Sequence, residues 1–311
     1  MDLLDDHLTR ARASGAVFAR TVAAPPWGLR LGGSIQLAVH AVVRGRAWLW
    51  FDDDSESPME LSAGDVTLVR GGRDHYIGHE PGAECLEPDE FRARHGRSDD
   101  PRATVFLCGA YRLSGDVGRG LLEVLPPVLP LSAAVGDPLR DVIDLLSGEL
   151  AFRGPGYPTV LDRLLDILLV LAIRTSFRQR ETAPPWYRAS VDPRLNAALQ
   201  AIHSDAGHPW SVTELAEICR LSRAAFARTF RDVLGQTPME YLTDWRMTLA
   251  RDHLRSGELS LGQIASAVGY GSPYAFAAAF RRRHGEPPGA WKQQELSRTS
   301  SPVAEDGSHF R

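Results

Sequence analysis

The sequence has 311 residues, of which 43% are apolar and 24% are charged, and its formal net charge is −4. This length allows two or three domains, and no apolar run approaches the roughly 18 residues of a membrane span. Residues 1–6 lack the basic and then apolar order of a secretion signal, and the three cysteines, an odd number at wide spacing, argue against a disulfide framework. These features argue against a membrane-spanning helix and a disulfide framework, and we expect a cytoplasmic protein.

Residues 15–115 contain short stretches of alternating apolar and polar residues, separated by turn sequences. Ile35–His40 and Ala47–Phe51 are two such stretches, and Gly32-Gly33 and Asp52–Ser55 are two of the turns. Many short strands with polar turns are typical of a β-sandwich or a small β-barrel.

The stretch from Gly64 to His75 is similar to the second sequence motif of cupins, in which a glycine, a hairpin and a histidine follow one another. Arg70 stands where that motif has proline. Together with Val43-Arg-Gly45, the stretch resembles the cupin-type sensor domain that precedes AraC-like DNA-binding domains. The resemblance implies a cupin-like β-barrel sensor over residues 1–130.

The cupin resemblance also implies a place for metal ligands. Metal-binding cupins take two histidines and a glutamate from the first motif, but here Ala38 occupies the glutamate position, and His40 lies two residues on, on the same strand face. Nitrogen and sulfur donors suit zinc or another borderline divalent metal. The alternative is that these side chains line an organic-ligand pocket or pack in the barrel. The candidate metal ligands are His40, His75, His79 and Cys108, and the candidates for redox sensing or ligand binding are Cys85 and Cys108.

Residues 81–103 are charged and rich in turn formers, which predicts a long loop, and the prolines of residues 121–131 are expected to end the β region. Two helices are predicted next, from Asp137 to about Phe152 and from Val160 to Phe177. The second has a broad apolar face that needs cover. It can pack on the barrel and on the first helix, form a homodimer, or do both. Residues 131–190 are predicted as a helical dimerisation segment that ends in a linker, residues 178–190.

A duplicated stretch dominates the last third of the chain. Ser222–Pro238 and Ser272–Pro288, fifty residues apart, are identical at eight of 17 positions. In the first copy Ser222 is a good N-cap, Phe226 and Phe230 begin a buried stripe, and Gly235 can end the helix. Each copy is therefore predicted to be the second helix of a helix-turn-helix motif.

Serine and threonine capping boxes mark the other helices of this region. They are Ser211–Glu214, Thr237–Glu240 and Ser260–Gln263. The helix that begins after Thr237 should run to about Arg255, roughly 27 Å at 1.5 Å per residue. One turn of B-DNA is about 34 Å, so this connecting helix can set two recognition helices in successive major grooves.

Residues 192–292, with these two motifs and the ending Phe280–Trp291, look like the DNA-binding domain of AraC/XylS-type transcription regulators. The resemblance implies a DNA-binding domain over residues 191–295, and the polar residues 296–311 are predicted to be a disordered tail. This domain has twelve Arg or Lys and eleven Asp or Glu residues, so the arginines clustered around the recognition helices are more informative than its net charge.

The resemblance also assigns exposed positions to DNA. In the first motif, Ala224, Ala227 and Arg228 face base edges, and Arg228 is the strongest candidate because a guanidinium can bind guanine O6 and N7 together. Arg223 and Arg231 are expected on phosphates. The matching positions of the second motif offer few hydrogen bonds, so this motif should recognise thymine methyls, DNA shape or backbone. Its candidate residues are Ser272, Pro273, Tyr274, Ala275, Ala278, Arg281 and Arg282.

These features predict an α+β multidomain protein that is not an enzyme but a sequence-specific transcription regulator. Its cupin-like domain is expected to sense a small molecule, a metal or a redox signal. The expected partners are double-stranded DNA, the effector, a second copy of the chain and, if the protein is an activator, RNA polymerase. The alternative is a metal-dependent cupin enzyme fused to a DNA-binding domain, and the missing glutamate counts against it.

Overall fold

A computed structural model describes residues 3–4, 14–32, 35–53, 56–95, 98–113, 115–134, 136–152, 154–179 and 183–300. Contacts among these residues divide the chain into two units. The sheet unit contains the described residues of 14–113 and 121–179, and the helical unit contains residues 3–4, 115–120 and 183–300. The division falls inside helix α3 (Gly115–Val124), whose first part belongs to the helical unit.

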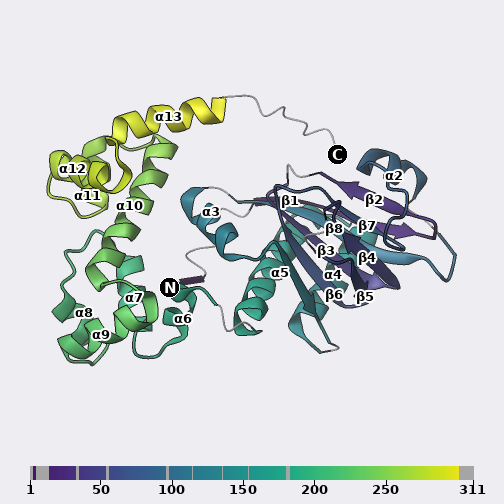
Figure 1. The fold of residues 1–311 in the computed structure, drawn as a ribbon, viewed down its shortest axis with the longest axis horizontal. Helices are drawn as coiled ribbons and strands as arrows, with labels where there is room; N and C mark the ends of the chain where they lie inside the picture. The colour runs from purple at the N-terminus through teal and green to yellow at the C-terminus, as the bar shows by residue number, and fades with distance from the viewer. Residues whose placement is uncertain are drawn as a thin grey trace. The chain divides into compact units, whose positions relative to one another are not determined.

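The sheet unit contains two antiparallel sheets (Figure 1). One has the strand order β1-β8-β3-β6-β9 and the other the order β2-β7-β4-β5. Apolar side chains from both sheets form one core, in which the rings of Trp27 and Phe106 stack at 4.8 Å between centroids. The strands are β1 (Ser14–Ala23), β2 (Gly28–Leu31), β3 (Leu37–Arg44), β4 (Arg46–Trp50), β5 (Met59–Ser62), β6 (Asp65–Arg70), β7 (His75–Gly78), β8 (Thr104–Arg112) and β9 (Val128–Ser132).

The prediction of a mixed α and β protein with a β-rich N-terminal domain is confirmed, but the prediction of a closed barrel is wrong. Closure requires hydrogen bonds between the edge strands of the two sheets. Among the described strands, β1 and β9 remain edges of one sheet, and β2 and β5 remain edges of the other. The unit is therefore a sandwich, the other arrangement that the strand pattern allowed.

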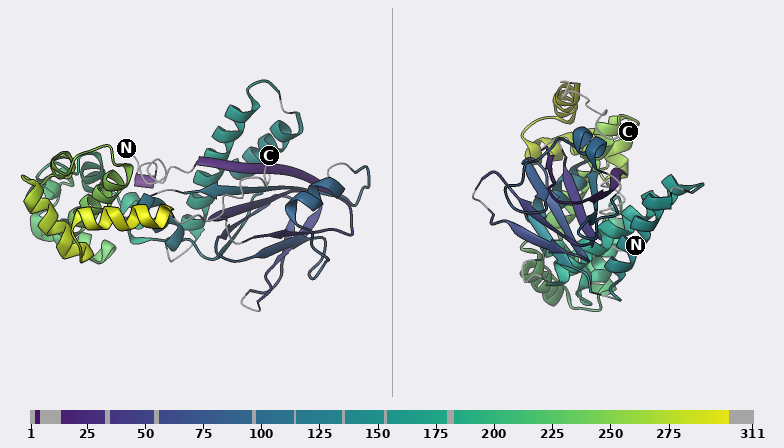
Figure 2. Two further views of the ribbon diagram at one scale, coloured as in Figure 1. Left: turned by 90° about the horizontal axis from the view of Figure 1, so that it is seen from above. Right: turned by 90° about the vertical axis from the view of Figure 1, so that its right-hand side faces the viewer.

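Two helices cover the five-stranded sheet, as Figure 2 shows. Helix α4 (Pro138–Phe152) packs on β1 and β3, and α5 (Tyr157–Gln179) packs on β1, β9 and α4. The Tyr111 hydroxyl of β8 donates a hydrogen bond to the Leu165 carbonyl of α5, at 2.8 Å. Both helices were predicted from sequence, and their packing on the sheet confirms one of the two roles proposed for the apolar face.

Three predicted irregular segments contain regular structure instead. Helix α2 (Pro88–Arg94) lies within the predicted loop, with acidic residues in its first turn and arginines in its last, which favours a helix. The end of α3 and strand β9 lie where prolines were expected to end the β region, because β9 pairs along β6. Helix α6 (Pro185–Val191) lies in the predicted linker and starts with proline at its first position.

The helical unit has its own apolar core, which includes Leu3 and Val117 as well as residues of the C-terminal helices. Helix α13 continues to Ser300, into the tail predicted as disordered, and residues 301–311 of that prediction lie outside the described residues. Among the described helices, none is long and apolar enough to cross a membrane. The C-terminal helices are α7 (Asn196–Ser204), α8 (Val212–Ile218), α9 (Arg223–Leu234), α10 (Pro238–Ser256), α11 (Leu261–Ala267), α12 (Pro273–His284) and α13 (Pro288–Ser300).

The predicted helix starts are largely confirmed. Thr237 and Ser260 each form a complete capping box, with Glu240 and Gln263 respectively. Ser211 accepts a hydrogen bond from the Glu214 main-chain N–H, but the Glu214 carboxylate pairs with His208, at 2.9 Å, instead of completing the box. Local side-chain chemistry therefore sets where most of these helices begin.

Candidate nucleic-acid interface

The two predicted recognition helices, α9 and α12, are built in the same way. Ser222 and Ser272 cap them by accepting main-chain hydrogen bonds, at 3.3 and 3.1 Å. Each helix ends at a glycine in the left-handed conformation, Gly235 or Gly285. The duplicated phenylalanines form the buried side of each helix, with ring centroids 5.5 Å apart in α9 and 5.7 Å apart in α12.

The outer side of α9 is basic. Arg223, Arg228 and Arg231 are exposed together with Ala224, and Ala227 is half-buried. Small alanines between arginines leave room for a helix to approach the floor of the major groove, while guanidinium groups can bind base edges or phosphates. The structure thus brings the five residues predicted for the first motif together on one helix.

The outer side of α12 has a different chemistry. Tyr274 is 88% exposed, and Pro273, Ala275 and Ala278 are exposed around it. Ser272 is half-buried, and its hydroxyl takes part in the N-cap. The surface near the start of α12 therefore offers apolar and aromatic contact and few side-chain hydrogen bonds.

Arginines at the end of α12 supply its charge. Arg281, Arg282 and Arg283 are all exposed, and Arg283 forms an ion pair with Asp244 of α10, at 2.8 Å. Arg281 and Arg282, the two predicted DNA contacts, form no ion pair within the described part of the chain. They are free to bind phosphate, whereas Arg283 holds α12 to the connecting helix.

The turns of the two motifs differ by one residue. The Leu221 main-chain N–H donates to the Ala216 carbonyl, and Tyr270 makes the matching bond to Ala265. Ser222 follows Leu221 directly, whereas Gly271 separates Tyr270 from the cap Ser272. The duplicated recognition helices are therefore entered through turns of different length.

A further difference lies at the left-handed position of each turn. Arg220 has a φ of 54°, and Gly269 at the matching position has a φ of 77°. A Cβ on Gly269 would lie 2.6 Å from the Gly207 carbonyl oxygen, so only glycine fits there. The first motif carries an arginine in a conformation that non-glycine residues seldom adopt.

Arg246 of α10 links the two motifs. Its Nε donates to the Ala206 carbonyl at 2.7 Å, and its Nη2 donates to the His208 carbonyl at 2.8 Å, both in the segment that leads into the first motif. The same guanidinium lies over the ring of Tyr270, 6.0 Å from its centroid, in the turn of the second motif. One side chain thus contacts both motifs from the helix that connects them.

In the sheet unit, three of the predicted metal or redox residues meet in the core. His40 Nε2 lies 2.9 Å from His75 Nε2, and His40 Nδ1 lies 3.1 Å from Cys108 Sγ. Burial lowers the pKa of His40 well below its usual value and lowers that of His75 to about 4, and burial raises the pKa of the Cys108 thiol. At neutral pH all three groups are uncharged, and the tautomer of His40 sets which atom donates in each of the two contacts.

This cluster does not fit a three-ligand metal site. The sulfur of Cys108 and the nitrogen of His75 lie on opposite sides of the His40 ring, so the three donors do not converge on one point. Within the described residues, no group of three or more His, Cys, Asp or Glu side chains is arranged to hold a metal ion. A zinc site requires four converging ligands or three with an open position.

The other two predicted residues of the sensor lie apart from this cluster. His79 Nδ1 is 2.8 Å from the Trp27 carbonyl oxygen, and Cys85 donates to the Ala83 carbonyl at 3.2 Å. Partial burial raises the pKa of the Cys85 thiol to about 11. A thiol with a raised pKa carries little of the reactive thiolate at neutral pH.

Sequence reasoning missed two polar side chains. Arg246 gave no signal because its partners are main-chain carbonyls, which any sequence provides. Thr67, directly opposite His40 in the pairing of β3 with β6, is fully buried, and its hydroxyl has no hydrogen-bond partner among the described residues. The alternation of residues along β6 could have placed Thr67 on the inner face, two positions before the inward-facing Val69.

Comparisons with known proteins also divide the chain into an N-terminal and a C-terminal domain. The sequence matches the cupin family over residues 2–178 and the helix-turn-helix domain family over residues 215–294. An AraC-like transcription regulator of Streptomyces lividans is 31% identical over 94% of this chain and 98% of that protein. The RCS-specific HTH-type transcriptional activator RclR of Escherichia coli is 30% identical over 94% of this chain and 98% of that protein.

Among solved structures, the DNA-binding domain of AdpA in complex with a target DNA is similar to the C-terminal part of the chain. It is 28% identical and covers 36% of this chain and 99% of that chain, with a TM-score of 0.33.

Proposed function

The chain belongs to the AraC-type DNA-binding transcription regulators that carry an N-terminal cupin domain, and we propose that α9 and α12 bind successive major grooves of one operator. The observation that carries this proposal is the pair of helices built on identical cores, with their exposed faces free of the unit's own packing. Arg228 contacts a base, and Arg223, Arg231, Arg281 and Arg282 contact phosphates. The protein acts in the cytoplasm, where its DNA is.

Selection from random duplexes with the full chain, followed by fluorescence anisotropy, tests this function. The selected duplex should bind at least about a thousandfold more tightly than random DNA at physiological salt, the lower end of the range of specific regulators. Its footprint should cover two adjacent helical turns. Equal affinity for selected and random duplexes would eliminate sequence-specific binding as the function.

The sensor is proposed to bind a small polar molecule between the two sheets. Support comes from the polar groups of the sandwich core, where the His40 and His75 pair lies on the inner faces and the Thr67 hydroxyl is buried with no hydrogen-bond partner among the described residues. Buried polar groups in an apolar core are costly unless they are paired, so they are suited to recognising a ligand. Mass spectrometry of molecules that co-purify with the chain tests this directly.

A metal ion is the second candidate for the ligand of the sensor. The alternative function, a cupin enzyme, would also require a bound metal ion. The missing glutamate and the non-converging donors both weigh against a bound metal ion. Metal analysis of the purified protein gives the answer: zinc or another divalent ion at one per chain would restore the metal proposal. Loss of that ion on replacing His40 by Gln would place it in this cluster.

A homodimer is proposed to form through α4 and α5. Each helix exposes two apolar residues seven positions apart, which places them on one face. They are Leu145 and Phe152 on α4, 57% and 82% exposed, and Val160 and Ile167 on α5, 41% and 46% exposed. Sedimentation equilibrium at micromolar concentration should give twice the chain mass, and Leu145→Glu/Phe152→Glu should give the monomer.

If the protein is an activator, its dimer also contacts RNA polymerase at the promoter. Transcription in vitro from a template that carries the selected duplex measures the sign of regulation. An increase in transcript that depends on the full chain supports activation, and a decrease identifies a repressor.

A further inference from the structure

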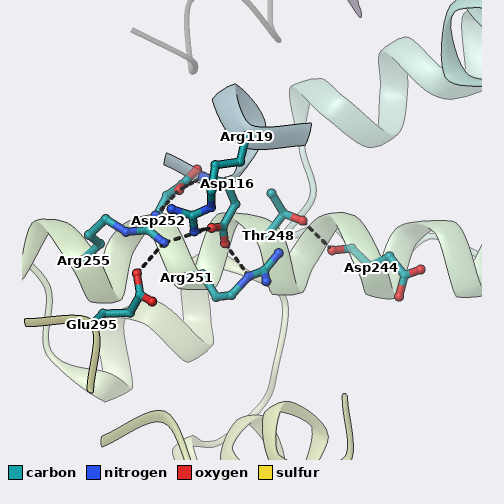
Figure 3. A network of polar contacts seen from close by, with 8 residues as sticks. All are labelled: Asp116, Arg119, Asp244, Thr248, Arg251, Asp252, Arg255 and Glu295. Carbon is teal, nitrogen blue, oxygen red and sulfur yellow. Dashed lines mark hydrogen bonds and ion pairs between the residues drawn. The ribbon is translucent and has the colours of Figure 1, made fainter. Parts of the chain in front are cut away.

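A buried carboxylate in α3 binds two arginines of the connecting helix α10. The side chain of Asp116 is 6% exposed, and its Oδ2 lies 2.5 Å from Arg251 Nε while its Oδ1 lies 2.9 Å from Arg255 Nη2. Arg119 of the same helix also pairs with it. Figure 3 shows these side chains converging on Asp116 over α10. One carboxylate therefore balances several guanidinium groups in the helical unit.

The main chain of α3 is held to α10 as well. The Asp116 N–H donates to Asp252 Oδ1 at 3.3 Å. Gly115 before it has a φ of 71°, and a Cβ there would lie 2.9 Å from the same oxygen. Glycine thus provides the left-handed conformation and the close approach that bring the start of α3 to α10.

Val117 of α3 also makes apolar contacts in the helical unit. Val117 is 5% exposed and belongs to the core of the helical unit, although in sequence it lies between strands β8 and β9 of the sheet unit. Strand β8, which carries Cys108, ends at Arg112, and α3 begins at Gly115. The start of α3 therefore packs in the helical unit, although it lies between two strands of the sheet unit in the sequence.

The network continues toward the second recognition helix. Arg255 also pairs with Glu295 of α13 at 3.2 Å, and its guanidinium lies 5.3 Å from the centre of the Trp291 ring. Trp291 packs against Phe280, a buried residue of α12, with ring centroids 6.0 Å apart. Contacts thus run from Asp116 through Arg255 and Trp291 to α12.

Among the described residues, no comparable chain of contacts joins Asp116 to the first recognition helix. Helix α9 packs mainly on α6, α8 and α10, and the described ion pairs of Asp116, Arg251 and Arg255 include no residue of α9. Phe230 of α9 contacts Tyr241, near the opposite end of α10 from Arg251 and Arg255. Loss of the Asp116 charge should therefore affect the position of α12 more than that of α9.

We propose that Asp116 is a positioning residue for the second recognition helix, through which the segment that follows β8 sets how well α12 binds DNA. The proposal rests on DNA binding by the two motifs. Removing the carboxylate leaves Arg251 and Arg255 partly buried without their main partner, and a charge left in that state drives local rearrangement. The rearrangement falls on the C-terminal half of α10 and on α13, and α13 packs on both α10 and α12.

The test compares full-length Asp116→Asn with Glu123→Gln, an exposed carboxylate of the same helix. The probe is the selected duplex, and the readouts are anisotropy and hydroxyl-radical footprinting. Benzoylphenylalanine placed at the exposed Tyr274 identifies by crosslinking the half of the duplex that α12 binds. Asp116→Asn should weaken binding about tenfold and lose protection mainly in that half, whereas Glu123→Gln should leave both halves protected.

A double variant separates positioning from simple destabilisation. Asp116→Asn/Arg251→Gln also removes one of the guanidinium charges, and it should recover part of the affinity and of the α12 footprint. If Asp116→Asn does not fold, the double variant is tested alone, and a smaller loss of protection, still confined mainly to the half that α12 binds, is expected. Equal weakening of both halves, or wild-type footprints in both variants, overturns the proposal. Failure of the wild-type chain to bind any selected duplex would instead overturn the proposed function.

Discussion

The two helix-turn-helix motifs share an interior and differ at their surfaces. Phe226 and Phe230 of α9, and Phe276 and Phe280 of α12, are all fully buried. The exposed faces differ, since Arg228 in α9 corresponds to Ala278 in α12. Packing restrains the interior because each buried ring contacts many neighbours, whereas an exposed position is restrained only by what it binds. The comparison indicates that the copies keep one fold and present different chemical groups on their exposed faces.

The largest effect is expected when the phenylalanines that the two motifs share are replaced. Phe226→Ala and Phe276→Ala should each lower the free energy of unfolding of the helical unit by about 3–5 kcal/mol, because each leaves a cavity in the core. Urea unfolding followed by circular dichroism measures both. Val191→Ala, at an exposed position of α6 in the same unit, is the control and should change little. A core that tolerates one of the two buried replacements would show that the motifs are not built alike.

The contact between the motifs is tested at Arg246. Arg246→Ala should cost about 2–3 kcal/mol of stability, because two main-chain carbonyls lose a charged donor. It should also relax the preferred spacing between the two halves of the operator, measured with duplexes in which base pairs are inserted between them. Arg246→Lys keeps the charge but cannot donate to both carbonyls in the same geometry, so an intermediate loss is expected. If Arg246→Ala keeps the same preferred spacing between the two halves of the operator, then Arg246 contributes to stability alone.

The difference between the exposed faces is tested on DNA. Arg228→Ala should weaken binding to the selected duplex by about 1–3 kcal/mol and relax preference at one base pair, because a guanidinium that holds a base is lost. Arg282→Ala should weaken specific and random DNA alike, because it removes a phosphate contact. Competition binding across single-base variants of the duplex distinguishes the two. Equal losses on specific and random DNA for both variants would contradict the assignment.

The smallest effects are expected in the turns, where the two motifs should respond with opposite signs. Gly269→Ala should lower the stability of the helical unit by at least about 1–2 kcal/mol, because alanine resists the left-handed conformation and its Cβ would also crowd the Gly207 carbonyl oxygen. Arg220→Gly should raise it by about 0.5–1 kcal/mol, because glycine relieves the same strain in the first motif. Thermal unfolding of both variants measures the signs. A loss of stability in Arg220→Gly would show that the arginine side chain makes a contact worth more than the strain.

Much of the helical unit could be predicted from sequence because its signals are local. A capping serine and the N–H that it satisfies are three residues apart, as in Ser222 with Ala225, and the buried phenylalanines repeat every four residues. The exposed candidates of α9 and α12 follow from the same periodicity, so their grouping on one face of each helix was foreseeable.

The sensor was harder to predict because its contacts join distant parts of the chain. His40 and Cys108 were both chosen as candidates, but only the pairing of β3 with β8 brings them together. The tertiary structure also places His79 against the Trp27 carbonyl oxygen, away from the other candidates. Whether the sheets form a sandwich or a barrel depends on the pairing of their edge strands, which no local sequence pattern specifies.

By itself the sequence determined the family, the two helix-turn-helix motifs and the helix starts, because these depend on hydrogen bonds and apolar contacts within a few residues. Only the tertiary structure decided that the start of α3 belongs with α10. The Asp116 N–H bonds to Asp252 across 136 positions, and its carboxylate pairs with Arg255 across 139. A lone aspartate between two strands carries no local sign of such partners, because the pairing exists only once the chain has folded.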